Sequence, residues 1–396
     1  MVVVREICGF LGKVHWMRRM NWDELNARRL ARHALDAPAK EARPADIVTA
    51  MAGTHAQVLS AAELGIALRI EGATRADVRA ALWQDRSLVK TYGPRGTVHL
   101  LPAAELGMWI GALTALPTVD PAPPGRRMTP EQTDEVVAAV GDALSDAELT
   151  IDELTAAVVE RTGPWAGELV MPAFQGMWPR WRQAHHEAGI RGALCFGPNR
   201  GRKVTYTNPH RWLPGLEPMP AEEALPRLVH RYLNAYGPST PQRFAHWLNT
   251  PVTWANELFE RMSGELERVD VEGEANWVTA GDTAVPAGPP RGVRLLPYFD
   301  TYAYRVGNQP APILYPGEAA ERVRPANYQV LLVDGVVTGL WHQRRSGRKL
   351  ALTVEPLIAL TRAQRAELDA QAERVGEILE AKPELTIGKV TVGGHA

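Results

Sequence analysis

The sequence predicts an α+β protein made of three tandem winged helix-turn-helix units followed by a β-rich, barrel-like C-terminal region. Capped amphipathic helices followed by two β-prone runs recur three times along the 396 residues. Their loose period of about 90 residues is typical of a tandem array and not of one large core. The Pro- and Gly-rich stretch "GDTAVPAGPPRG" separates the last repeat from strand-like segments.

The first unit covers residues 21–118 and follows an N-terminal extension, residues 1–20. Its first helix starts with the capping-box sequence "NWDE", and its apolar stripe leaves three arginines on the outer face, Arg28, Arg29 and Arg32. A second helix runs into "MAGTHAQ", a third is "AAELGIALRI" behind the box "SAAE", and a fourth is "ADVRAALWQD" behind the box "TRAD". The stretch "SLVKTYGPRGTVHLLP" then predicts a hairpin.

The second unit covers residues 119–217 and the third covers residues 218–285. In the second, Thr129 and Thr150 cap two helices ahead of the hairpin "GALCFGPNRGRKVTYTNP". In the third, three helices precede the strands "LERVDVEG" and "ANWVTAG". The C-terminal domain, residues 286–396, contains strands with an Asp-Gly hairpin turn, and its closing amphipathic helix is expected to pack on that sheet.

Composition and hydropathy predict a soluble cytoplasmic protein, which we expect to be a monomer. Hydrophobic residues make up 45% of the chain and charged residues 22%, as in ordinary globular proteins. Cys8 and Cys195 are isolated, which argues against disulfides and fits a reducing compartment. No apolar run approaches the roughly 20 residues that cross a bilayer. Charges at Arg5, Glu6 and Lys13 interrupt the apolar core that a signal peptide needs.

The formal net charge is −1, but the sequence contains two basic clusters without acidic residues. They lie in turn-like, glycine-containing contexts and are Arg200, Arg202, Lys203 and Arg211, and Arg344, Arg345, Arg348 and Lys349. Each cluster alone is most simply a solvated loop, but two together favour a polyanionic partner. No metal-ligand spacing is present, because the adjacent histidines at 185 and 186 point apart on a helix. No phosphate loop or dinucleotide fingerprint is present either, so we expect neither a metal nor a nucleotide cofactor.

Several motifs carry a resemblance to a known family. "NARRLARHAL", "GTHAQ", "LVKTYGPRGTVHLLP", "LLPYFDTYAYRVG" and "VLLVDGVVTGLWHQRR" resemble the bacterial winged-helix DNA glycosylases of the AlkZ and YcaQ types. The resemblance runs from about Asn21 into the C-terminal region, and its R-G-T-x-H-L and D-G-x-V-x-G-x-W elements are the specific ones. It implies three tandem winged-helix units around a concave, positively charged surface for duplex DNA, and an enzyme that removes bulky alkylated guanines and unhooks interstrand crosslinks.

The resemblance also implies an active site. The family motif is glutamine-x-glutamine or glutamine-x-aspartate at the end of a helix, and by position it falls on His55-Ala56-Gln57. His55 departs from the more common glutamine, a variant accepted in the AlkZ-like branch, and the division of labour between His55 and Gln57 stays open. The pair can share a face only if the helix ends near Thr54, which Gly53 permits. The alternative from the residues alone is a core histidine beside a surface glutamine.

The chemistry suits uncharged residues. Guanine alkylated at ring nitrogen seven is cationic and leaves as a neutral base, so it needs little general acid. The remaining tasks are to stabilise an oxocarbenium-like sugar and to place a water beneath its anomeric carbon. Gln57 can position that water, and neutral His55 can hold it or accept its proton. The motif contains no lysine to form a Schiff base, so no strand cleavage is expected.

Other candidates are weaker. Asp300 could offer a supporting carboxylate, but an aspartate after an aromatic strand is more often a turn cap. Arg95 and His99 fit phosphate contacts or hairpin structure equally well. The second-unit hairpin and the turn from Arg344 to Lys349 are the expected backbone contacts with DNA. Three tryptophans are expected in the core or in interfaces rather than stacked on bases: Trp178, Trp181 and Trp341.

The resulting hypothesis is a monofunctional DNA glycosylase for bulky N7-alkylguanine adducts, with self-resistance to a DNA-alkylating natural product as a possible setting. A different class of protein, a non-catalytic winged-helix transcription regulator, would bind a defined sequence without preferring lesions. A catalytically inactive crosslink-recognition protein would prefer damaged DNA and release no base. The polar pair argues against both, because recognition helices would carry arginines there.

Overall fold

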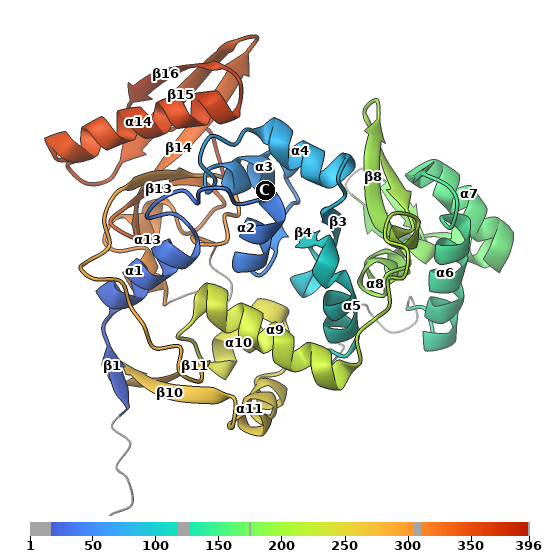
Figure 1. The fold of residues 1–396 in the computed structure, drawn as a ribbon. Helices are drawn as coiled ribbons and strands as arrows, with labels where there is room; N and C mark the ends of the chain where they lie inside the picture. Colours follow the sequence, from blue (N-terminus) through green and yellow to red (C-terminus); the bar gives the residue numbers. More distant parts are fainter. Residues whose placement is uncertain (1–16, 118–126, 174–175, 305–309, 395–396) are drawn as a thin grey trace, which may run out of the picture.

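The fold is mixed helix and strand, with the first unit at the centre of the molecule (Figure 1). The computed structural model describes residues 17–117, 127–173, 176–304 and 310–394. In this part of the chain the strands form three three-stranded sheets, one two-stranded sheet and one five-stranded sheet. The second unit and the C-terminal sheet lie on opposite sides of the first unit, and the third unit lies below it in the view of Figure 1.

The first unit alternates short helices with a small sheet of order β2-β4-β3. Its elements are α2 (Pro44–Ala50), β2 (Thr54–His55), α3 (Leu59–Ala67), α4 (Arg75–Trp83), β3 (Leu88–Tyr92), β4 (Val98–Pro102) and α5 (Leu106–Thr114). The predicted hairpin is confirmed as β3 and β4, which pair in antiparallel register. The short strand β2 lies between two helices and pairs with β4.

The second unit repeats this order with a sheet of order β5-β9-β8. Its elements are α6 (Pro130–Ala143), β5 (Leu149–Thr150), α7 (Ile151–Thr162), β6 (Leu169–Ala173), β7 (Gly176–Pro179), α8 (His185–Ile190), β8 (Cys195–Arg200) and β9 (Lys203–Thr207). The short strand β5 again lies between two helices and pairs with the second strand of the hairpin. The hairpin of β6 and β7 is an insertion that the sequence did not predict.

The third unit follows the same plan with one change. Its elements are α9 (Ala221–Tyr236), α10 (Pro241–Leu248), α11 (Val252–Arg261), β10 (Leu266–Val271) and β11 (Glu274–Thr279). A single bridge from Ser239 to Trp277 takes the place of the short strand between the first two helices. On the other edge, β1 (Arg18–Met20) pairs parallel with β10, so the predicted N-terminal extension contributes its last residues to this sheet.

The C-terminal region is a curled five-stranded sheet covered by a helix. Its elements are β12 (Val293–Leu296), α12 (Ala311–Leu314), α13 (Ala319–Arg322), β13 (Gln329–Val333), β14 (Val336–Ser346), β15 (Lys349–Pro356), α14 (Arg362–Ile378) and β16 (Lys382–Ile387). The Asp-Gly turn between β13 and β14 and the packing of α14 on the sheet are as predicted. One apolar cluster joins the first unit, the second unit and this sheet, which fixes their relative positions.

Helix α1 (Trp22–Arg32) corrects one prediction. Its capping box between Asn21 and Glu24 is confirmed, but Arg28 and Arg29 are buried and not on an outer face. Arg28 forms an ion pair with Asp282 at 2.8 Å, and Arg29 donates to the backbone carbonyl of Tyr236. The arginines therefore attach α1 to the third unit, because a buried guanidinium needs acceptors that only tertiary packing supplies.

The start of helix α3 also differs from the prediction. It starts after Val58 without a side-chain cap, so the predicted box of Ser60 with Glu63 is wrong. Glu63 is buried and paired with Arg79 of α4 at 2.7 Å. Because that carboxylate is used between two helices, it is not available to cap the start of α3.

Candidate active site

The motif at residues 55–57 lies just beyond the end of a helix. α2 ends at Ala50, and Ala52 and Gly53 adopt left-handed backbone conformations with φ of 54° and 87°. These two residues turn the chain into the extended segment β2, which contains His55. The helix therefore ends before the motif.

His55 and Gln57 flank a residue that points into the core. Ala56 is fully buried in the core and its N–H donates to the carbonyl of Val98 at 2.7 Å. The extended strand ends at His55, and the chain bends at Gln57 before α3 begins. His55 is 8% exposed, and Gln57 is exposed at the bend before α3. The pair thus combines a nearly buried imidazole with an amide in contact with solvent.

Aromatic rings surround the His55 imidazole. The ring of Phe299 lies 4.6 Å from it, the ring of Tyr304 lies 5.6 Å away, and the ring of His99 meets it edge to face at 5.4 Å. His99 is the cross-strand partner of His55 on β4, whereas Phe299 and Tyr304 come from the segment after β12. The site is therefore assembled from the first unit and the C-terminal region.

His99 is held in one orientation within the hairpin. Its Nδ1 lies 2.9 Å from the carbonyl oxygen of Thr97, so this nitrogen carries the proton and donates. Burial lowers the pKa of His99 well below its ordinary value, and the neighbouring His55 and Arg95 lower it further. Gly93 is required here, because a Cβ on it would lie 2.8 Å from the His99 ring.

Arg95 is also engaged by the protein. Its guanidinium donates to the carbonyl of Trp247 at 2.8 Å and lies 5.4 Å from the ring of Tyr304. Of the two roles considered for Arg95 and His99, the geometry favours hairpin structure over phosphate contact.

Asp300 is occupied by a buried ion pair. Its carboxylate accepts two hydrogen bonds from Arg69, at 2.7 and 2.8 Å, and both side chains are almost fully buried. The same carboxylate accepts from the N–H of Tyr302 at 3.0 Å, which is a turn-cap contact. Asp300 therefore ties the C-terminal segment to the end of α3 instead of presenting an oxygen to a substrate.

Comparison with known proteins decides the family. A sequence model of the family described as "DNA glycosylase AlkZ-like" matches residues 48–378. The chain belongs to the AlkZ-like DNA glycosylase family. It is 33% identical over 337 residues to a Streptomyces sahachiroi protein named "Interstrand DNA cross-link repair glycosylase", covering 82% of this chain and 88% of that protein. The solved structure of Streptomyces sahachiroi DNA glycosylase AlkZ superposes with a TM-score of 0.77 at 29% identity, covering 93% of this chain and all of that one.

Family membership makes this AlkZ-like chain an enzyme that hydrolyses N-glycosidic bonds, and the matched region contains both His55 and Gln57. The described residues contain no cluster of three or more His, Cys, Asp or Glu side chains able to hold a metal ion. Cys195 is buried, which raises the pKa of its thiol, while Cys8 lies outside the described residues. Among the described helices, none has the length and apolar composition needed to cross a membrane.

The basic hairpin of this AlkZ-like chain is partly neutralised. Arg200 donates to Glu153 at 2.9 Å, and Lys203 contacts Asp152 at 3.2 Å, both at the start of α7. Arg202 is exposed at the tip and takes part in no ion pair among the described residues. Two of the three basic residues of this hairpin would therefore exchange a carboxylate partner for a phosphate on binding DNA.

In the turn from Arg344 to Lys349, fewer of the basic side chains form ion pairs with described residues. Arg344 and Arg348 are exposed on the hairpin of β14 and β15. Arg345 donates to the carbonyl of Leu379 at 2.7 Å, and Lys349 forms an ion pair with Glu384 at 3.3 Å. Arg211, the last member of the second-unit cluster, donates to the hydroxyl of Thr207 and supports that hairpin from within.

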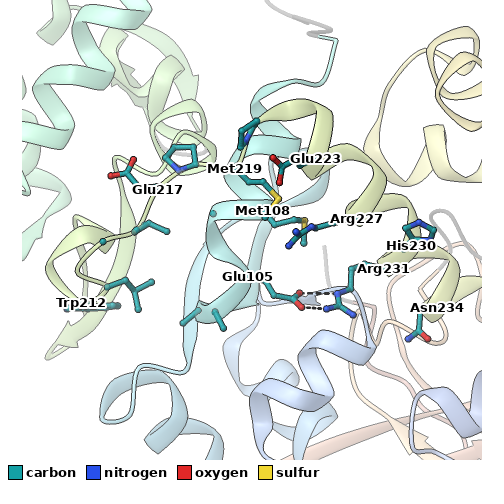
Figure 2. Close-up of a pocket in the computed structure, with 18 of the residues that line it drawn as sticks. Glu105, Met108, Trp212, Glu217, Met219, Glu223, Arg227, His230, Arg231 and Asn234 are labelled. Atoms are coloured by element: carbon teal, nitrogen blue, oxygen red, sulfur yellow. Dashed lines mark hydrogen bonds and ion pairs between the residues drawn. The ribbon is translucent and has the colours of Figure 1, made fainter. Parts of the chain in front are cut away.

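A large cavity lies away from the motif. Figure 2 shows it between α5, α9 and the segment that joins the second and third units, with a volume of about 1090 Å³. Arg231 of α9 and Glu105 form an ion pair across it, and Met108 and Met219 supply apolar surface. Neither His55 nor Gln57 lines this cavity, so volume alone does not identify the site.

Sequence reasoning missed two aromatic neighbours of His55. Phe299 and Tyr304 lie within the quoted motif "LLPYFDTYAYRVG", but no local pattern shows that this motif faces residue 55. Of the three tryptophans, Trp181 and Trp341 are buried as predicted, whereas Trp178 is 42% exposed on the inserted hairpin and its ring lies 3.9 Å from the Arg182 guanidinium.

Proposed function

We propose that this chain is a monofunctional glycosylase that hydrolyses the N-glycosidic bond of bulky N7-alkylguanine adducts in duplex DNA, including those that crosslink the two strands. The observation that supports the proposal is that α2 ends before His55 and Gln57, which leaves both residues outside a helix at the position of the family motif. The name of the Streptomyces sahachiroi relative, an interstrand crosslink repair glycosylase, supports the substrate class.

In the proposed reaction, a water attacks the anomeric carbon as the cationic base departs. Gln57, which is exposed at the bend after His55, accepts a hydrogen bond from this water and orients it. The neutral imidazole of His55 receives the proton that the water loses, and the departing guanine leaves uncharged. Orientation and proton acceptance together are sufficient, because the charge on the lesion supplies the leaving-group activation.

The repeated helix and hairpin order supports three winged-helix units, residues 21–118, 119–217 and 218–285, ahead of the C-terminal domain, residues 286–396. In each unit a short strand or bridge between two helices pairs with the second strand of the hairpin. We place duplex DNA against the two basic hairpins. The contacting side chains would be Arg200, Arg202, Lys203, Arg344, Arg345, Arg348 and Lys349, with Arg95 and His99 shaping the first hairpin.

Base release under single-turnover conditions tests the proposal. The duplex would carry one defined N7-alkylguanine, and wild type would be compared with His55→Ala and Gln57→Ala. We expect Gln57→Ala to slow release at least about 100-fold with duplex binding unchanged. Gln84→Ala and His246→Ala, which truncate exposed residues elsewhere, are the matched controls and should release base at the wild-type rate.

Three outcomes would contradict the proposal. If wild type binds damaged duplex but releases no base from any of several simple and bulky adducts, the chain is a recognition protein. If undamaged duplex of a defined sequence competes equally with alkylated duplex, it is a DNA-binding regulator. A product cleaved at the abasic site would contradict the monofunctional assignment. Release from an adduct made by a natural product would support a role in self-resistance.

A further inference from the structure

The segment from Pro297 to Tyr304 brings the C-terminal region onto the proposed catalytic strand. The Phe299 ring lies against the His55 imidazole at 4.6 Å with a tilt of 39°. The ring of Tyr304 lies 5.6 Å from both of these rings. The hydroxyl of Thr301 donates to the carbonyl of Gly53, in the turn that leads into β2. One segment thus contacts the turn and the imidazole together.

Phe299 adopts a conformation that is costly for its residue type. Its φ is +58°, in the left-handed region where the Cβ of a non-glycine residue meets the following carbonyl. Such a conformation persists when the surrounding contacts over-determine it. The contacts on either side of Phe299 must therefore hold the backbone in place.

The buried pair of Arg69 and Asp300 fixes the backbone next to Phe299. Arg69 is fully buried and donates twice to the carboxylate of Asp300. Its guanidinium also donates to the carbonyl of Gly65 in α3 at 2.7 Å. The backbone carbonyl of Asp300 accepts from the N–H groups of Ala303 and Tyr304, which closes a tight turn directly after Phe299.

The pair also connects this turn to the motif. α3 starts two residues after Gln57 and ends two residues before Arg69. A Cβ on Gly65 would lie 3.2 Å from the Asp300 carboxylate, so the helix and the turn are in close contact. The strand that contains His55 and the segment that contains Phe299 are thereby fixed to the same helix.

We infer that Phe299 is a positioning residue for His55, and that the pair of Arg69 and Asp300 holds Phe299 in place. Phe299 contacts the imidazole from one side while His99 meets it edge to face from β4. Together they restrict the ring to one plane, so that a fixed nitrogen is presented to the attacking water. This inference rests on the proposed catalytic role of His55.

A double-mutant cycle tests the inference. Phe299→Leu keeps a large apolar side chain but loses the flat ring, and should slow base release about tenfold or more without changing duplex affinity. In the His55→Ala background the same change should have no further effect, because the ring that it positions is gone. Equal losses in both backgrounds would show a general structural role and overturn the inference.

A matched variant separates positioning from loss of stability. Tyr315→Phe removes a buried hydrogen bond to the carbonyl of Ala303 in the same segment, at a site that does not contact His55. We expect Tyr315→Phe to lower the melting temperature yet retain the wild-type rate. If it slows release as much as Phe299→Leu, the segment acts only through stability.

A measurement that needs no activity keeps the two proposals distinguishable. Imidazole nitrogen resonances of His55, assigned by their loss in His55→Ala, should shift and broaden in Phe299→Leu and remain unchanged in Tyr315→Phe. Unchanged resonances in Phe299→Leu would overturn the positioning role even if the enzyme is a glycosylase. If wild type releases no base but the resonances respond as expected, Phe299 orders the His55 ring and it is the proposed function that fails.

Discussion

At the scale of single residues, the site depends on contacts between distant parts of the chain. The family motif placed the candidate pair at residues 55 and 57, although the motif has glutamine and not histidine at the first position, and Gly53 predicted the end of the helix before them. The left-handed Phe299 could not be predicted, because nothing in its local sequence favours that conformation. Asp300 was considered as a supporting carboxylate with a turn cap as the commoner alternative; it does cap a turn, and its pairing with Arg69 is set by tertiary packing.

The buried pair gives a stability prediction at this scale. Asp300→Asn leaves the Arg69 guanidinium buried without a counter-charge, so we expect a loss of about 3 to 5 kcal/mol in the free energy of unfolding. Asp46→Asn breaks the solvent-exposed pair with Arg43 and should cost less than about 1 kcal/mol. Urea unfolding monitored by tryptophan fluorescence measures both. Equal, small losses would mean that the buried pair contributes no more than a surface one.

At the scale of elements, local signals were sufficient where the stabilising partner is near in sequence. The helix caps at Asn21, Thr74, Thr129 and Thr150 are confirmed. They could be predicted because each cap and its partner lie within one turn of the chain. The parallel strands β1 and β16 were not predicted, because their partners are separated from them by whole helices or units. The failed cap of α3 has the same origin, as Glu63 is used by a neighbouring helix.

The second-unit hairpin gives a prediction about DNA binding. Changing Arg200, Arg202 and Lys203 together to alanine should weaken duplex binding and flatten its salt dependence, with a slope change of roughly 0.9 for each phosphate that is no longer neutralised. Arg43→Ala, at an exposed residue paired within its own turn, is the control. Titrations at several salt concentrations measure the slope. An unchanged slope in the triple variant would mean that this hairpin does not bind phosphate.

The acids beside the hairpin give the opposite prediction. Glu153→Gln removes the negative charge that pairs with Arg200, so the guanidinium can meet a phosphate without first giving up an ion pair. Duplex affinity at low salt should rise a fewfold, because Arg200 no longer has to break an ion pair with Glu153 in order to form one with a phosphate. A matched change at Glu135, an exposed acid of α6, should leave affinity unchanged. Weaker binding of Glu153→Gln would show that this carboxylate holds the hairpin in its binding conformation.

At the scale of the whole molecule, buried neutral histidines couple folding to pH. Burial lowers the pKa of His33 and of His185 to about 3, and lowers the pKa of His99 well below its ordinary value. Unfolded histidine has a pKa near 6.5, so below that pH the unfolded chain takes up protons that the folded chain refuses. The contribution of these neutral histidines to the free energy of unfolding is complete above about pH 6.5. It is lost progressively as the pH falls toward their pKa values in the folded protein.

A substitution within this set gives the test. His185 packs among Trp181, Tyr92 and Tyr206, so phenylalanine can occupy its place. Between pH 6 and 5, His185→Phe should reduce the slope of unfolding free energy against pH by about 1.4 kcal/mol per pH unit, the contribution of one proton. The same change at the exposed His246 should leave the slope as in wild type. An identical slope in His185→Phe would mean that His185 is already protonated in the folded protein, and acid sensitivity would then have to come from the other two histidines.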